Sequence, residues 1–166
     1  MQGHPPCLDD PKGSTNGLAR LEKLCDDFRP ELLIIDPLSQ FHRAEENDNG
    51  AMTRVMQLFT HLSASKDCAV LINHHMSKGA ILSGQGALQQ STRGASALVD
   101  SARWMMTMTK PVVGRDREQK TEDSRKVLCA FPKLNNHAPI EPFTLYRGPG
   151  GVLDIMDPYG NGYDCR

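Results

Sequence analysis

Apolar residues recur with helical spacing in two segments of the first half of the chain. In "GLARLEKLCDDF", residues 17–28, they fall at three- and four-residue steps, and Pro30 closes the segment. This pattern predicts an amphipathic helix. A second stripe of the same kind begins at Met52 and reaches about Ser65, which predicts a second helix.

Two short aliphatic runs alternate with these helices. The runs are "LLIID" at residues 32–36 and "AVLIN" at residues 69–73, and each has the length of a strand. Continuous apolar runs of this length are typical of strands buried on both faces of a parallel sheet. A helix between two such strands predicts a βαβ unit, whose ligands bind at the carboxyl ends of the strands.

The second half of the chain is more irregular. The glycine-containing residues 78–93 predict a long loop, and the highly charged residues 111–126 predict a solvated one. Between them we expect a short helix over 94–102 and a strand over 103–109. Three further short strands, expected at an antiparallel edge, follow at residues 127–131, 143–147 and 152–155. The fold class expected is therefore α/β, in a single domain over residues 1–166 with residues 1–16 as loop.

Composition narrows the class of protein. The 166 residues contain 19 Lys and Arg against 20 Asp and Glu, so no global charge attracts the chain to nucleic acid, and any DNA contact must be local. The five cysteines form no CxxC pair, which argues against a disulfide framework and a structural zinc site. No window is apolar enough to predict a membrane span or a signal peptide, so we expect a cytoplasmic protein with no membrane partner.

Asp36 ends the first aliphatic run, and its position allows two interpretations. An acid at the end of an aliphatic strand is the Walker B pattern, in which a carboxylate orients the water shell of a nucleotide-bound Mg²⁺. An Asp that begins a turn before Pro37 is the structural alternative. The motif alone does not decide between them.

His74 and His75 follow the second run, and they point in opposite directions if the strand continues through them. At most one of them is expected to face a ligand. A histidine that hydrogen-bonds a phosphate oxygen suits this strand end, whereas a metal site built from Asp36, His42 and the two histidines lacks a spaced ligand motif. In "SARW", Arg103 adjoins Trp104, which can hold a guanidinium group in place for a phosphate.

Taken in order, these segments resemble a known family. The blocks "LLIIDPLSQFHRAEENDNG", "VLINHHMSKGA", "QQSTRGASALVDSARW", "FPKLNNHAP" and "GGVL" are similar to those of RecA-like hexameric replicative helicases of plasmids, the RepA type, over about residues 30–155. The resemblance implies the C-terminal part of a RecA-like P-loop NTPase core, from the Walker B strand onward. It also implies ATP and Mg²⁺ as cofactors, and single-stranded DNA and neighbouring subunits of a homo-oligomeric ring as partners.

The resemblance also implies roles for individual residues. Asp36 corresponds to the Walker B acid that binds Mg²⁺, His75 to the sensor of the γ-phosphate, and the neighbouring His74 is placed at the same nucleotide edge. Arg103 and, in "LYRG", Arg147 correspond to arginines that reach into a neighbouring subunit's site. The last two assignments are DNA contacts, at Lys78 and Arg93. Lys133 and Asn135 match the family without an assigned role.

One element of the family is missing from the 166 residues. They contain no GxxxxGK[ST] phosphate-binding loop and no preceding strand that carries a catalytic glutamate. We therefore expect a truncated or C-terminal portion of a replication protein, with weak or no ATP hydrolysis alone and an uncovered sheet face that favours self-association. The alternatives are a non-catalytic ring-joining module that donates Arg103 in trans and, less favoured, a metal-dependent hydrolase.

Overall fold

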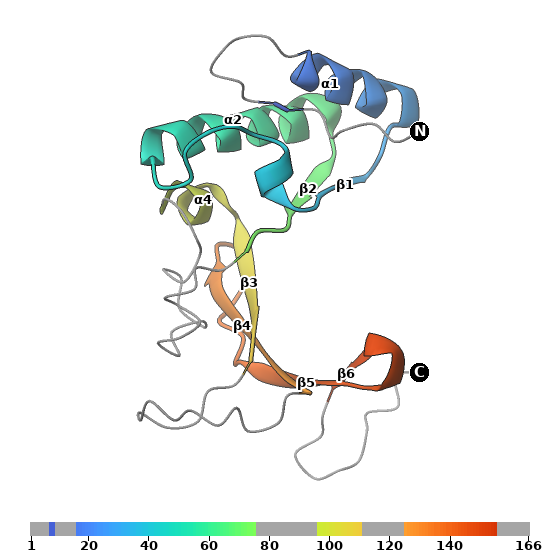
Figure 1. Cartoon of the computed structure of the whole chain (residues 1–166), viewed down its shortest axis with the longest axis vertical. Helices are drawn as coiled ribbons and strands as arrows, with labels where there is room; N and C mark the ends of the chain where they lie inside the picture. The colour runs from blue at the N-terminus through green and yellow to red at the C-terminus, as the bar shows by residue number, and fades with distance from the viewer. Residues whose placement is uncertain (1–6, 9–15, 76–95, 111–124, 156–166) are drawn as a thin grey trace. The chain divides into compact units, whose positions relative to one another are not determined.

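The computed structural model describes residues 7–8, 16–75, 96–110 and 125–155, and the chain divides into two compact units (Figure 1). Unit 1 comprises residues 1–77 and 92–101, and unit 2 comprises residues 78–91 and 102–166. The loop predicted at 78–93 and most of the loops predicted at 1–16 and 111–126 lie outside the described residues. The expectation of one partial domain stays a prediction.

Unit 1 contains helices packed on a small sheet. Its elements are α1 (Gly17–Phe28), β1 (Leu32–Ile35), the 3₁₀ turn η1 (Leu38–Gln40), α2 (Asn49–Lys66), β2 (Ala69–Ile72) and α4 (Ser96–Ser101). Strands β1 and β2 are parallel, and their register pairs Leu32 with Ala69 and Ile35 with Ile72. The predicted strand–helix–strand order and the parallel pairing are thus confirmed.

Helix α2 begins at Asn49, three residues earlier than the apolar stripe predicts. The reason is a cap: Asp48 Oδ1 accepts hydrogen bonds from the backbone N–H of Gly50 at 2.8 Å and of Ala51 at 3.2 Å. These bonds satisfy donors that a helix N-terminus otherwise leaves unpaired. The segment "ENDNG", expected to be loop, therefore contains the start of the helix.

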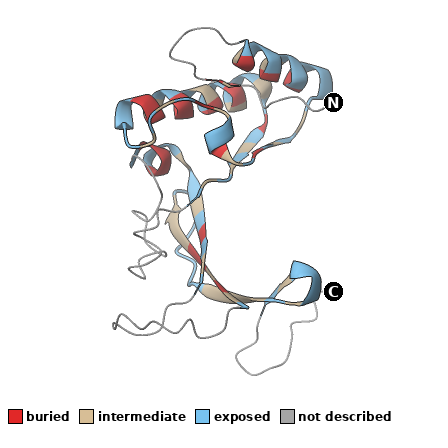
Figure 2. Ribbon diagram, viewed as in Figure 1, coloured by how far each residue is buried: buried red, intermediate tan, exposed pale blue. Residues whose placement is uncertain are grey.

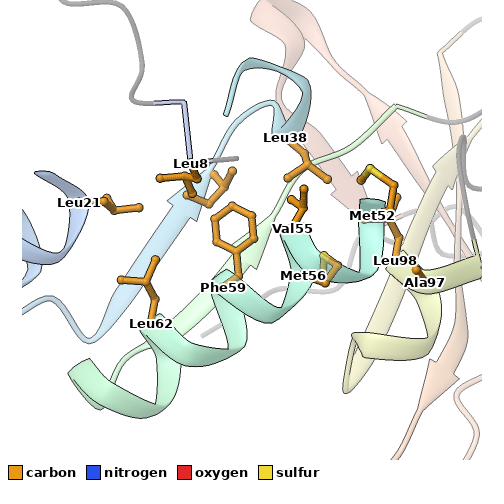
Figure 3. Close-up of a cluster of buried hydrophobic side chains, with 11 residues drawn as sticks. Leu8, Leu21, Leu38, Met52, Val55, Met56, Phe59, Leu62, Ala97 and Leu98 are labelled. Atoms are coloured by element: carbon orange, nitrogen blue, oxygen red, sulfur yellow. The ribbon is translucent and has the colours of Figure 1, made fainter. Parts of the chain in front are cut away.

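The core of unit 1 lies between the helices and one face of the sheet (Figure 3). The apolar stripe of α2 supplies much of it, and Figure 2 shows the buried residues of that helix along one side. The cluster consists of Leu8, Leu21, Ile35, Leu38, Met52, Val55, Met56, Phe59, Leu62, Ala97 and Leu98, with Leu33, Val70 and Ile72 of the strands packed against it.

The strands themselves are not buried on both faces, and this expectation is wrong. Leu32 and Ile34 remain 50% and 58% exposed, whereas Ile35 is 1% exposed. Because successive side chains of a strand alternate in direction, Leu33 and Ile35 face the helices while Leu32 and Ile34 face away. Within the described residues, the helices of unit 1 cover only one face of this sheet.

Unit 2 contains a four-stranded sheet in the order β3-β4-β5-β6. Its strands are β3 (Trp104–Thr109), β4 (Lys126–Leu134), β5 (Phe143–Arg147) and β6 (Leu153–Ile155), and each neighbouring pair is antiparallel. The four strands predicted in this region are confirmed. Strand β4 is longer than expected and continues through Pro132, next to a register shift in its pairing with β3 between Met105 and Thr107.

Candidate functional site

Asp36 and Asn73 occupy equivalent positions at the carboxyl edge of the parallel sheet. Each is the first residue after its strand, and the register that pairs Ile35 with Ile72 brings the two side by side. Both side chains are exposed. The edge at which ligands of parallel sheets bind therefore carries a carboxylate beside an amide.

Three hydrogen bonds connect Asn73 to the segment around Asp36. The Asn73 side-chain amide donates to Asp36 Oδ1 at 2.8 Å, and its backbone N–H donates to the carbonyl of Ile35 at 2.8 Å. Its carbonyl accepts from the backbone N–H of Leu38 at 2.9 Å. Leu38 is fully buried, so the turn that follows Asp36 is anchored in the core as well as to Asn73.

This arrangement fixes the Asp36 carboxylate and defines what it can bind. A hydrogen bond to Oδ1 restrains the rotation of the carboxylate, while the exposed position leaves the group accessible. Carboxylate oxygen is a ligand that Mg²⁺ accepts, commonly with retained waters and phosphate oxygens completing its shell. Asp36 can therefore take the role that its strand-end position suggests, and the residues present fit one protein ligand of a hydrated Mg²⁺.

His74 and His75 follow Asn73 directly, and they differ in burial. His74 is half-buried and His75 is exposed. The exposed His75 is accessible to a ligand at this edge, in agreement with the expectation that the two histidines differ in surroundings. Their roles as nucleotide contacts stay predictions.

The set of Asp36, His42, His74 and His75 does not form a metal-ligand group. Within the ranges that the structure describes, no three His, Cys, Asp or Glu side chains are placed to hold a metal ion together. His42 in particular is a core residue, 4% exposed. The geometry gives no support to the metal-dependent hydrolase.

The two arginines expected to reach a neighbouring subunit lie at opposite ends of β4. The Arg103 carbonyl accepts from the backbone N–H of Asn135, just after β4, whereas the Arg147 backbone N–H donates to the carbonyl of Arg125, just before it. Nine residues of strand separate these contacts, which is roughly 30 Å. Both arginines are exposed. Within one chain, Arg103 and Arg147 are therefore not brought together at a common site.

The remaining predicted residues divide between described and undescribed parts. Lys78 and Arg93, the expected DNA contacts, lie outside the described residues. Lys133 lies on β4, where it pairs with Met105. Asn135 supports Arg103 through the backbone bond already given.

The sequence interpretation missed Asn73, although a signal for it was present. Attention to ionisable side chains selected His74 and His75, but the first polar residue after the second aliphatic run is Asn73. Parallel strands that end in register bring together the first residue after each strand. Counting from the strand ends would therefore have paired Asn73 with Asp36.

Comparisons with known proteins agree with the α/β ATPase fold. Residues 4–80 match the sequence pattern of a family described as an AAA domain, a span that includes Asp36 and His75 and begins well before β1. The structure resembles a solved structure described as the ATPase domain of another protein, with a TM-score of 0.59 and 13% sequence identity. That match covers 84% of this chain and 50% of the other, so the chain spans about half the length of the structure it matches.

These matches confirm the predicted fold class: the chain has a RecA-like ATPase fold with parallel strands and an antiparallel sheet. The matched sequence span, residues 4–80, differs from the expected span of about 30–155. None of the described helices is both long enough and apolar enough to span a bilayer.

Proposed function

We propose that the chain is part of an ATP-dependent replication protein of the RecA-like class, and that Mg²⁺ with the phosphates of ATP binds at the carboxyl edge of β1 and β2. The observation that carries this proposal is the Asp36 carboxylate, accessible and held by Asn73 at the edge where parallel sheets bind ligands. The finer assignment, a plasmid helicase of the RepA type that acts on single-stranded DNA as a ring, rests on the resemblance of the sequence blocks.

Each residue at this edge has a distinct task in the proposal. Asp36 orients the hydrated Mg²⁺, Asn73 holds Asp36 in orientation, and His75 contacts a phosphate oxygen. When bound, Mg²⁺ neutralises charge on the phosphates. Because the 166 residues contain no GxxxxGK[ST], they supply no backbone cradle for the phosphates, and ATP affinity is expected to be weaker than micromolar.

Binding of ATP to the chain tests the proposal. Saturation-transfer NMR on the ATP protons detects complexes too weak for calorimetry. We expect a transfer signal that requires Mg²⁺ and that falls strongly in Asp36→Asn, whereas Asp27→Asn, which neutralises an exposed carboxylate of α1, keeps it. A signal that is independent of Mg²⁺, or equal in the two variants, would contradict the assignment of Asp36. Micromolar affinity would contradict the expectation drawn from the missing phosphate loop.

A second candidate is a ring-joining module that donates Arg103 to a neighbour's site. It is favoured by the exposed position of Arg103, whose backbone is held by Asn135. An arginine supplied in trans can accelerate phosphoryl transfer by about 10³- to 10⁵-fold. In a mixture with a RecA-like ATPase that carries its own GxxxxGK[ST], the wild-type chain would change the ATPase rate and Arg103→Ala would not. Equal effects of the two would exclude this candidate.

A further inference from the structure

The charges of the chain are divided unevenly between its two units. Unit 2 contains eleven Lys and Arg against eight Asp and Glu, a net charge of +3, whereas unit 1 contains eight against twelve, a net charge of −4. The two values sum to the net charge of −1 for the chain. Among the described residues of unit 2, the acids are Glu141 and Asp154, and the cations are Arg103, Lys110, Arg125, Lys126, Lys133 and Arg147.

Strand pairing places Lys126 and Lys133 on the same face of the antiparallel sheet. Met105 and Thr107, two residues apart on β3, share a face, and they pair with Lys133 and Ala130 respectively. Paired residues of antiparallel strands point to the same side. Lys126 precedes Ala130 by four residues on β4, so it also belongs to that side.

An aromatic ring and a third cation lie at the Lys126 end of this face. Tyr146 on β5 pairs with Lys126, and the Arg125 guanidinium carbon lies 5.4 Å from the centroid of the Tyr146 ring. Asp154 of β6 pairs with Tyr146 and places a carboxylate at one margin. We call Arg125, Lys126, Lys133 and Tyr146 the basic face.

The length and chemistry of the basic face fit an extended polyanion. Seven residues of strand separate Lys126 from Lys133, which is roughly 20 Å, a length over which a nucleic-acid strand presents several phosphates. The Arg125–Tyr146 pair offers a planar group against which a base can stack. Stacking of this kind requires a base that is not paired within a duplex.

We propose that the basic face binds single-stranded nucleic acid, with Lys126 and Lys133 contacting phosphates and the Arg125–Tyr146 pair contacting a base. The inference rests on the proposed function only in taking DNA as the partner. It assigns the contact to the antiparallel sheet rather than to Lys78 and Arg93.

Fluorescence anisotropy of a short labelled oligothymidylate, titrated with the full chain at several salt concentrations, tests the proposal. We expect Lys126→Ala/Lys133→Ala to weaken binding about tenfold or more, and to reduce the slope of log K against log salt by about 1.4, because each phosphate contact on a single strand contributes about 0.7. The matched control, Arg20→Ala/Arg54→Ala, removes two exposed charges from unit 1 and should bind like the wild type. Emission of Trp104, the single tryptophan of the chain, reports whether the sheet keeps its fold.

Several outcomes would overturn the inference. One is equal loss in the two double variants, which would indicate a general charge effect. Others are tighter binding of duplex, or binding of polyglutamate in place of the oligonucleotide, and absence of binding by the wild type. If Lys78→Ala/Arg93→Ala abolishes binding while Lys126→Ala/Lys133→Ala does not, the basic face is excluded but DNA remains the partner in the proposed function. Binding of Mg²⁺ and ATP at Asp36 is measured independently of all these results.

Discussion

The side-chain amide of Asn73 donates a hydrogen bond of 2.8 Å to Oδ1 of Asp36. The two residues lie in register, immediately after two parallel strands, and the backbone of Asn73 also bonds to Ile35 and Leu38 on either side of the Asp36–Pro37 peptide. An exposed carboxylate is ordinarily free to rotate. Here its orientation is set by a residue of the neighbouring strand, which prepares it for a cation at this edge.

Replacing Asn73 by Ala should weaken cation binding without unfolding the chain. The backbone bonds of residue 73 remain, and a single hydrogen bond contributes about 0.5–1.5 kcal/mol, so Mn²⁺ affinity should fall a few-fold. Water-proton relaxation measures the bound Mn²⁺. Asn136→Ala, which truncates an exposed asparagine of unit 2, is the control and should bind like the wild type. An unchanged affinity in Asn73→Ala would show that Asn73 does not position Asp36.

The sequence predicted the elements of unit 1 well because local signals define them. Spaced leucines and Pro30 gave α1, and the aliphatic runs gave β1 and β2. The start of α2 was missed because its signal is a capping side chain, Asp48, rather than an apolar residue.

Burial and register could not be obtained in the same way. An aliphatic run has the same composition whether one or both faces are covered, so the exposure of Ile34 was not predictable from it. Likewise, nothing in the spacing of Arg103 and Arg147 indicates that β4 holds them at opposite ends, because strand pairing is a long-range property.

Asp48→Ala should destabilise unit 1 by about 1 kcal/mol, since it removes both hydrogen bonds of the α2 cap. Asp48→Ser keeps an acceptor oxygen and should lose much less. Urea unfolding followed by circular dichroism measures both variants. Equal losses in the two variants would show that the cap is not the source of the stability.

The uncovered face of the parallel sheet should make the isolated chain self-associate. Ile34 is 58% exposed, and a parallel sheet is ordinarily covered on both faces. Ile34→Thr keeps a β-branched residue and should increase the monomer fraction measured by light scattering after gel filtration. Ile35→Thr, at a buried position on the opposite face, should unfold the chain instead. A monomeric wild-type chain with a cooperative thermal transition would contradict this prediction.

The buried thiols should react slowly and should limit stability at high pH. Burial raises the pKa of Cys25, with a smaller effect of the neighbouring Cys68, and burial also raises the pKa of Cys129. Native Cys25 and Cys129 should therefore be alkylated by iodoacetamide more slowly than the half-buried Cys7, as measured by mass spectrometry, and urea should remove the difference.

The same shifts set the direction of a pH effect. Above the ordinary thiol pKa of 9.0, the unfolded chain releases protons that the folded chain retains, so the free energy of unfolding should fall as the pH rises further. Cys129→Ala should reduce this fall. A stability profile that is flat through this range would contradict the assignment.

The placement of Mg²⁺ at Asp36 is tested most directly by Mn²⁺-induced line broadening in the ¹H–¹⁵N spectrum of the full chain. We predict broadening that begins at the amides of Asp36, Leu38 and Asn73, is competed by Mg²⁺, and disappears in Asp36→Asn. Broadening that is centred elsewhere, or that persists unchanged in Asp36→Asn, would contradict the account.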